Sequence, residues 1–130
     1  MTTYFVQQPD LDLRPPPDSP NGLSRRALGL THEYIVENLG EHVTLNDLAQ
    51  VIGLSRFHFA RQFRRSTGES PMRYVQRCRI ESAKRLLRHG ELLMTEIAVN
   101  VGFCDQSHFS RSFIKLVGMT PREFAHGSIE

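Results

Sequence analysis

The most restrictive feature of this sequence is an internal repeat. The stretch GLSRFHFARQFRRSTGESP, from Gly53 to Pro71, recurs in similar form as GFCDQSHFSRSFIKLVGMTP, from Gly102 to Pro121. The offset between the copies is 49 residues at the start of the stretch and 50 afterwards, so the second copy has one extra residue, most simply Cys104. Two copies are too few for a solenoid. The repeat therefore predicts two related modules on one chain.

The first copy has the pattern of two short helices joined by a tight turn. Thr44 is a good N-cap for a helix that continues through Val51. Gly53 allows the turn, and Ser55 caps a second helix over residues 56–66. Two short helices around a Gly-containing turn of three or four residues predict a helix-turn-helix.

The second copy predicts the same arrangement with a weaker start. Its helices are expected at residues 93–101 and 106–116, and Asp105 is the predicted N-cap of the second of them. Leu93 takes the place of Thr44. We therefore expect the first helix of this copy to lack a side-chain cap and to fray.

Three further helices complete the prediction. A first helix begins after Ser24, continues to about Leu39 and ends at Gly40, which suits the left-handed position after a helix. A long helix over residues 71–89 follows the first copy, and a capping box at Thr120 opens a short last helix. The predicted fold class is all-α with about seven helices: a Pro-rich N-terminal arm (1–22), a first helix-turn-helix lobe (23–70), a linker helix (71–90) and a second helix-turn-helix lobe (91–130).

Positive charge is concentrated in the middle of the chain. Residues 55–88 contain ten basic and two acidic residues, a net charge of +8, while the remainder carries −6 and the whole chain +2. Such a concentration is the footprint expected of a polyanion partner. Solvated helix faces would explain it equally well, so charge alone leaves both interpretations open.

Other functional classes find little support in the sequence. No apolar run approaches the roughly 18 residues of a membrane span, and the N-terminal residues lack the features of a signal peptide. Cys78 and Cys104 match no metal or redox spacing, so we expect two reduced thiols. No carboxylate pair, nucleophile–base pair or phosphate-binding loop stands out. We expect no enzyme activity, no cofactor and no metal, in a cytoplasmic protein.

These stretches resemble a known family, the AraC/XylS class of bacterial transcription regulators. The resemblance covers residues 23–124 and is carried by LNDLAQVIGLSRFHFARQFRRSTGESPMRYV, RIESAKRLL and EIAVNVGFCDQSHFSRSFIKLVGMTPREF. It implies a DNA-binding domain of two helix-turn-helix lobes joined by one long helix. Two residues depart from the family pattern, Cys104 for a commoner serine and Leu93 for a polar cap. Both concern local stability rather than the recognition faces.

Most members of this family also carry an effector-binding or dimerisation domain. We expect no such domain in the first 22 residues. The chain is therefore expected to be either a small standalone member or the DNA-binding part of a longer regulator. The resemblance suggests an activator that recruits RNA polymerase, although the residues themselves do not separate activation from repression.

The second helix of each lobe is the expected recognition helix. In a helix-turn-helix this helix lies in the major groove, with its N-terminal residues at base edges. Its DNA-facing side must lie opposite the buried phenylalanines of the same helix. Arginine can donate two hydrogen bonds to guanine, and glutamine can pair in the same way with adenine. The predicted base contacts are Arg56, Phe57, Ala60, Arg61, Gln106, Ser107, Ser110 and Arg111.

A second group of cations is predicted to contact phosphates, which set register without carrying sequence information. These residues are Arg64, Arg65, Arg73, Arg77 and Lys115, and the alternative for each is a solvated surface position. Phe57 also has an alternative, because it could cover the junction with the first helix instead of touching DNA. His58 and His108 are expected at the lobe surface near the DNA backbone.

The two lobes differ enough to predict an asymmetric binding mode. The first recognition helix has four arginines and no acid, so we expect the first lobe to supply more of the salt-dependent affinity. The linker helix would be roughly 28 Å long at about 1.5 Å per residue, shorter than the about 34 Å between successive major grooves on one face. We therefore expect a bent DNA or a partly engaged lobe, and a monomer on a non-palindromic site.

Two other classes of function are weaker alternatives. One is a protein-interaction module that has lost DNA binding. The other is an enzyme, because some relatives attach this kind of domain to a DNA-repair methyl acceptor with a reactive cysteine. Cys78 falls on a helix stripe and Cys104 in a turn, so that role does not transfer. The expected partners are double-stranded promoter DNA in the bacterial nucleoid and RNA polymerase.

Overall fold

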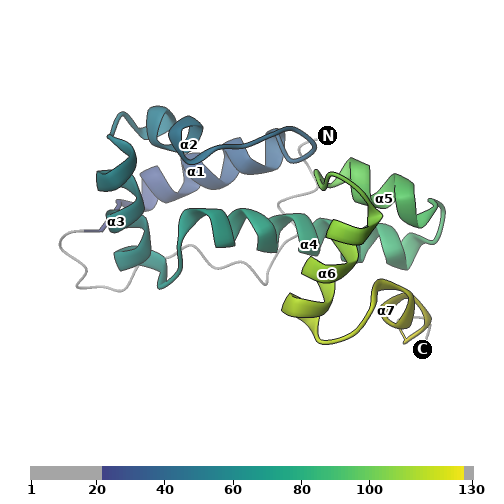
Figure 1. Cartoon of the computed structure of the whole chain (residues 1–130). Helices are drawn as coiled ribbons and strands as arrows, with labels where there is room; N and C mark the ends of the chain where they lie inside the picture. The colour runs from purple at the N-terminus through teal and green to yellow at the C-terminus, as the bar shows by residue number, and fades with distance from the viewer. Residues whose placement is uncertain (1–21, 128–130) are drawn as a thin grey trace. The chain divides into compact units, whose positions relative to one another are not determined.

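A computed structural model of the protein describes residues 22–127, so the Pro-rich arm expected at residues 1–22 lies outside the described residues except for Gly22. These residues form seven α-helices and no strand, which confirms the all-α prediction (Figure 1). None of these helices has the length and apolar character needed to cross a membrane. The helices are α1 (Arg25–Glu37), α2 (Leu45–Ile52), α3 (Arg56–Thr67), α4 (Pro71–His89), α5 (Met94–Asn100), α6 (Gln106–Val117) and α7 (Pro121–Gly127).

The described residues divide into two compact units. The first unit comprises residues 22–38 and 43–75, with α1, α2, α3 and the start of α4. The second unit comprises residues 39–42 and 76–127, with the rest of α4 and α5, α6 and α7. Each unit thus contains one helix-turn-helix, formed by α2 and α3 in the first and by α5 and α6 in the second.

An aromatic chain forms the centre of the first unit. The ring centroids of Phe59 and Phe63 lie 5.7 Å apart, and those of Phe63 and Tyr74 lie 5.6 Å apart. These three side chains are fully buried, as expected from the four-residue spacing on α3. Ser66, also buried, accepts a hydrogen bond from the backbone N–H of Leu23 at 2.8 Å and so holds the residues just before α1.

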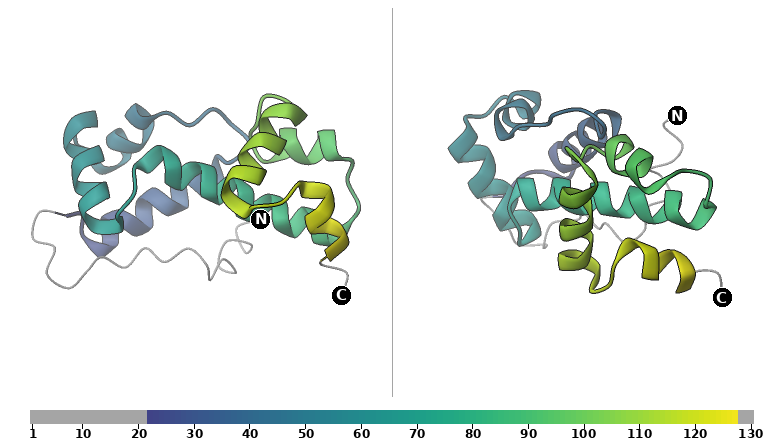
Figure 2. Two further views of the ribbon diagram at one scale, coloured as in Figure 1. Left: turned by 60° about the horizontal axis from the view of Figure 1, so that its bottom comes forward. Right: turned by 45° about the vertical axis from the view of Figure 1, so that its right-hand side comes forward.

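The second unit, whose α6 and α7 are seen as ribbons in Figure 2, repeats this packing with equivalent residues. The ring centroids of Phe109 and Phe113 are 5.7 Å apart, and those of Phe113 and Phe124 are 5.6 Å apart. Phe124 therefore takes the place that Tyr74 has in the first unit, as the repeat predicts. Two phenylalanines and a third aromatic ring, in the same order and at nearly the same spacing, position α3 and α6 within their units.

The backbone at the two turns shows where the extra residue of the second copy lies. The Leu54 N–H donates to the carbonyl of Ala49 at 3.0 Å, and the Phe103 N–H donates to the carbonyl of Ala98 at 2.9 Å. These bonds are equivalent at an offset of 49, whereas the N-caps of α3 and α6 are equivalent at an offset of 50. The extra residue therefore follows Phe103, in agreement with the assignment to Cys104.

The predicted N-caps are present, and the missing side-chain cap of α5 is partly replaced by another hydrogen bond. Thr44 and Asp47 form a reciprocal capping box with two bonds of 3.0 Å. Leu93 provides no side-chain cap to α5, but the carboxylate of Glu96 accepts the backbone N–H of Leu93 at 2.8 Å. This single bond satisfies one of the donors at the helix start. α5 begins at Met94, one residue later than predicted.

The predicted end of the first helix was wrong. α1 ends at Glu37, not at about Leu39, and Asn38 is its C-cap. Gly40 does not adopt the left-handed conformation, since the positive-φ glycines of the described residues are elsewhere. A Cβ atom on Gly40 would lie 3.2 Å from the carbonyl oxygen of Asn100. A glycine at this position therefore permits a close backbone approach within the second unit.

Candidate nucleic-acid interface

The outward side of α3 carries the cations predicted to contact DNA. Arg56, Arg61 and Arg64 are exposed, and Ala60 is half-buried between them. Phe59 and Phe63 occupy the opposite side of the helix and are inaccessible to solvent. Ser55 accepts the N–H of His58 and so fixes the first turn. Because the buried phenylalanines hold one side of α3 against the core, the arginines lie on the other side, which could enter a groove of DNA.

Phe57 lies at the exposed N-terminal end of the same helix. Its side chain is 77% exposed, so it does not cover the junction with α1, which was the alternative to a DNA contact. The guanidinium carbon of Arg56 lies 5.9 Å from the centroid of the Phe57 ring. This cation–π contact pre-orders two candidate base contacts beside each other.

The outward side of α6 is more neutral. Gln106, Ser107 and Arg111 are exposed, and Ser110 is half-buried. Asp105 accepts the N–H of His108 at 2.8 Å and fixes the start of the helix. Ile114 continues this side with 44% exposure. α6 therefore presents an amide, two hydroxyls, one guanidinium and one aliphatic side chain.

The cations predicted to bind phosphates differ in their surroundings. Arg64, Arg65 and Lys115 are exposed near the C-terminal ends of α3 and α6. Arg73 is 56% exposed and forms an ion pair with Glu69 at 3.6 Å, with which a phosphate would compete. Arg77 is half-buried and lines a small pocket of about 70 Å³ next to the C-terminal end of α6. Arg64, Arg65 and Lys115 are therefore exposed to solvent, whereas Arg73 is paired with Glu69 and Arg77 is half-buried.

Several cations of these surfaces carry uncompensated charge. Within residues 22–127, Arg61, Arg64, Arg111 and Lys115 form no ion pair or hydrogen bond through their side chains. Uncompensated charge on one side of a helix favours an anionic partner over an intramolecular role.

One arginine of the basic segment is removed from this surface. Arg79 is only 6% exposed, and its guanidinium donates to the carbonyls of Leu39, Val101 (3.1 Å) and Glu41 (3.3 Å). Burial lowers the pKa of Arg79, but a guanidinium starts so high that it remains charged. Arg79 thus holds residues 39–42 against the turn before α6. The net charge of +8 overstates the charge that can face a polyanion.

The two aligned histidines have different environments. His58 is exposed on α3, whereas His108 is half-buried and its ring meets the edge of Phe103 at 5.0 Å. Among residues 22–127, no cluster of three or more His, Cys, Asp or Glu side chains could hold a metal ion. Cys78 is buried and Cys104 exposed, and neither is part of a disulfide.

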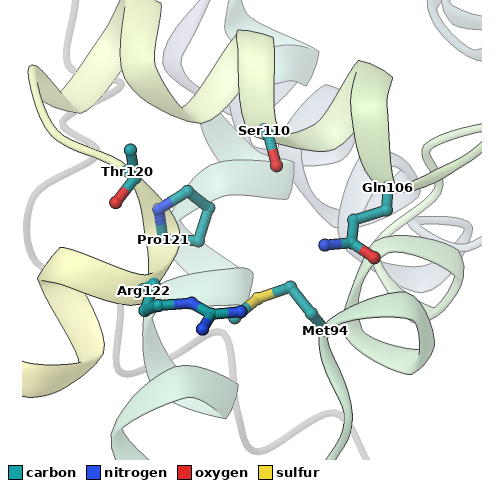
Figure 3. A pocket seen from close by; sticks show the side chains of 6 residues that line it. All are labelled: Met94, Gln106, Ser110, Thr120, Pro121 and Arg122. Carbon is teal, nitrogen blue, oxygen red and sulfur yellow. The ribbon is translucent and has the colours of Figure 1, made fainter.

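A pocket beside α6 contains a cation that sequence analysis did not select. The pocket has a volume of about 270 Å³, and Arg122 of α7 extends across it toward Met94 of α5, while Gln106 and Ser110 of α6 point into it from the other side (Figure 3). From the sequence, Arg122 was noted only as one residue of the capping box that begins at Thr120. Alignment of the two copies shows that Arg122 stands where the first copy has Met72, but it does not show that Arg122 lies beside Gln106 and Ser110.

Comparisons with known proteins fit this architecture. A family model described as a helix-turn-helix domain matches residues 48–127. The transcriptional activator RhaS of Escherichia coli O139:H28 is 35% identical over 107 residues, which are 82% of this chain and 38% of RhaS. The chain belongs to the AraC/XylS family of helix-turn-helix regulators. It spans somewhat more than a third of the length of the curated relatives that it matches.

Solved structures of this family are similar in fold. An AraC-type regulator from Chromobacterium violaceum has a TM-score of 0.77 and 25% identity, with 82% of this chain and 95% of that chain covered. The DNA-binding domain of AdpA, solved in complex with a target DNA, has a TM-score of 0.70 and 27% identity, with 75% of this chain and 87% of that chain covered. One solved structure that is similar to this chain therefore contains DNA.

Proposed function

We propose that this protein binds a specific promoter site and regulates transcription, with α3 and α6 as its two recognition helices. The observation that supports this most strongly is the equivalence of Arg61 and Arg111. Both are exposed, both lie opposite fully buried phenylalanines, and neither has an ion-pair partner within residues 22–127. Exposed, uncompensated arginines on the outer side of a recognition helix are suited to read guanine in the major groove.

The side chains divide into two roles under this proposal. Arg56, Phe57, Ala60 and Arg61 of α3, with Gln106, Ser107, Ser110 and Arg111 of α6, contact base edges. Arg64, Arg65, Arg73, Arg77 and Lys115 contact phosphates and set the register. Because α3 and α6 carry different side chains, a monomer reads an asymmetric site. No catalytic role is assigned to any residue.

The direction of regulation is part of the proposal. RhaS, which is 35% identical over most of this chain, is an activator. By analogy, the protein activates transcription in the bacterial cytoplasm, associated with the nucleoid, through contact with RNA polymerase. A promoter-fusion assay with and without the protein tests this, since a fall in reporter output would make it a repressor.

The DNA-binding proposal is tested by selection from random double-stranded DNA, followed by gel shifts and footprinting of the enriched sequence. The expected result is one non-palindromic site of about two helical turns that is bound by a monomer. Recovery of a palindrome would contradict the monomeric mode. If selection enriches no sequence at all, the protein is better explained as an interaction module that has lost DNA binding.

A further inference from the structure

The pocket between α5, α6 and α7 combines features suited to an anion. Its wall includes the guanidinium of Arg122, the amide of Gln106 and the hydroxyl groups of Ser110 and Thr120, with the thioether of Met94 at one side (Figure 3). Its volume of about 270 Å³ far exceeds the roughly 10–15 Å³ that one water requires. A tetrahedral anion with an attached organic group fits a space of this size and polarity.

The repeat shows that the cation at this place differs between the lobes. Gln106 is equivalent to Arg56, and Arg122 is equivalent to Met72, at the offset of 50. The first lobe therefore has its guanidinium at the start of the recognition helix and an apolar residue on the following helix. The second lobe has an uncharged amide at the start of its recognition helix and a guanidinium on the following helix. Arg122 therefore supplies a positive charge beside a recognition helix whose first residue is uncharged.

The side chain of Arg122 is available for a partner. It is exposed, and it makes no hydrogen bond or ion pair within residues 22–127. Two neighbouring backbone donors are occupied, because Thr120 Oγ1 accepts the Glu123 N–H at 3.0 Å and Glu123 Oε1 accepts the Thr120 N–H at 2.9 Å. The guanidinium of Arg122 is therefore the main group that an anion in the pocket would meet.

We propose that this pocket receives one phosphate of the DNA backbone, beside the groove that Gln106 and Ser110 face, and that Arg122 binds it. The inference rests on the proposed function, because it names a further contact of the same interface. The phosphodiester accepts hydrogen bonds from the guanidinium in a bidentate pair. The attached sugar lies against Met94. Arg122 thus adds a phosphate contact to the lobe with fewer cations on its recognition helix.

The first test is the salt dependence of binding to the selected site. Each neutralised phosphate contributes about 0.9 to the slope of log K against log salt, so Arg122→Gln should lower the slope by about that amount. Binding should weaken by a similar factor on every site sequence, because a phosphate contact carries no base information. Arg122→Lys keeps the charge and should keep most of the slope. An unchanged slope in Arg122→Gln would overturn the inference.

A matched control separates this role from simple support of α7. The guanidinium of Arg88 lies 5.1 Å from the centroid of the Phe124 ring, so Arg88→Gln makes the same charge change beside the same helix. Arg88→Gln should leave the slope unchanged. Equal slope losses in both variants would show a general effect of net charge and would contradict a specific contact. The thermal unfolding of both variants is compared to confirm that α7 remains folded.

The second test locates the phosphate. Single neutral methylphosphonates are placed along the half of the selected site that α6 contacts. In the wild type one position should weaken binding, and in Arg122→Gln the same position should cause no further loss, since the pair is already broken. Additive losses at every position would refute the contact. If wild-type protein selects no DNA, the proposed function itself fails, which is distinguishable from a failure of Arg122 alone.

Discussion

Some side chains of this protein anchor α3 and α6 in their units, and others lie on the opposite, exposed side of these helices. Arg61 and Arg111 belong to the second group, and each can donate two hydrogen bonds to guanine. We expect Arg61→Ala and Arg111→Ala each to weaken binding by about 1–3 kcal/mol and to relax base preference at one position. Competition gel shifts with every single-base variant of the site measure both effects.

The exposed Arg25 on the first turn of α1 provides the control, because Arg25→Ala makes the same charge change on a helix that is neither α3 nor α6. It should leave base preference intact. If Arg61→Ala weakens all sequences equally, Arg61 binds phosphate and not a base.

His32 gives the first unit a dependence on pH. Its Nδ1 lies 2.6 Å from the hydroxyl oxygen of Tyr74. Burial lowers the pKa of His32, against a smaller opposing effect of Glu33. The folded pKa is thus below the roughly 6.5 of an unfolded histidine, and between the two values the unfolded chain binds more protons. The free energy of unfolding should therefore fall as pH drops below about 6.5.

Urea denaturation at pH 7.5 and pH 5.5 measures this loss. His32→Gln should reduce the difference between the two pH values, because the titrating group is gone. His58→Gln, which removes an exposed histidine of the same unit, should retain it. A pH dependence that survives His32→Gln would assign the effect to another group.

At the scale of the helical elements, the two turns provide a matched pair of glycines. Gly53 and Gly102 have φ values of 86° and 95°, but a Cβ at Gly53 meets no atom within 4 Å. A Cβ at Gly102 would collide with the guanidinium of Arg79 and the carbonyl of Leu39. We expect Gly53→Ala to cost about 1–2 kcal/mol from backbone strain, and Gly102→Ala to cost about 1–3 kcal/mol more.

Urea denaturation of the two variants gives the comparison. The larger loss in Gly102→Ala should appear in the second unit, reported by near-UV signals of a tryptophan introduced at an exposed site there. Equal losses would mean that Arg79 moves away at little cost.

The start of α5 can be improved, because Leu93 is 68% exposed and supplies no cap. Leu93→Ser should stabilise the second unit by about 0.5–2 kcal/mol, as a serine at an N-cap usually does. Thr44→Ala should cause a loss of similar size in the first unit. Thermal unfolding of both variants checks the pair, and a Leu93→Ser protein that is less stable than wild type would contradict the capping argument.

Most of the elements could be predicted from the sequence because they depend on local chemistry. Thr44, Ser55 and Asp105 are caps whose hydrogen bonds span three residues, and the four-residue spacing of phenylalanines marks the buried sides of α3 and α6. The end of α1 could not be predicted in the same way. Asn38 closes the helix with its side-chain amide on the carbonyl of Tyr34, and the next residues, 39–42, are held by Arg79, which lies 40 positions away from Leu39.

In the candidate site too, some features follow from local sequence and others depend on residues that are distant in the chain. The exposed arginines of α3 and α6 follow from helical spacing, since they lie opposite buried rings. In the sequence Arg79 resembles a surface cation, because its neighbours give no sign that it donates to carbonyls of residues 39–42 and of Val101. Arg122 was missed because its relation to Gln106 and Ser110 exists only after α6 and α7 have packed.

For the whole molecule, the main consequence of the proposed function is that one chain would carry two different recognition surfaces. Once the first lobe is engaged, the second would bind as an intramolecular event, which raises affinity without any new contact. Selectivity should then depend on both lobes, and neither α3 nor α6 alone should account for the preference of the protein. This property separates a sequence-specific regulator from a basic protein that binds any polyanion.

The most direct test is therefore the ratio of dissociation constants for the selected site and for a scrambled duplex of the same length and composition, measured at about 150 mM salt. Specific regulators bind their sites at least about 10³-fold more tightly than other DNA, and we expect a ratio of that size. A ratio near one, with binding that disappears as salt is raised, would contradict the account, because it would reduce α3 and α6 to general cationic surfaces.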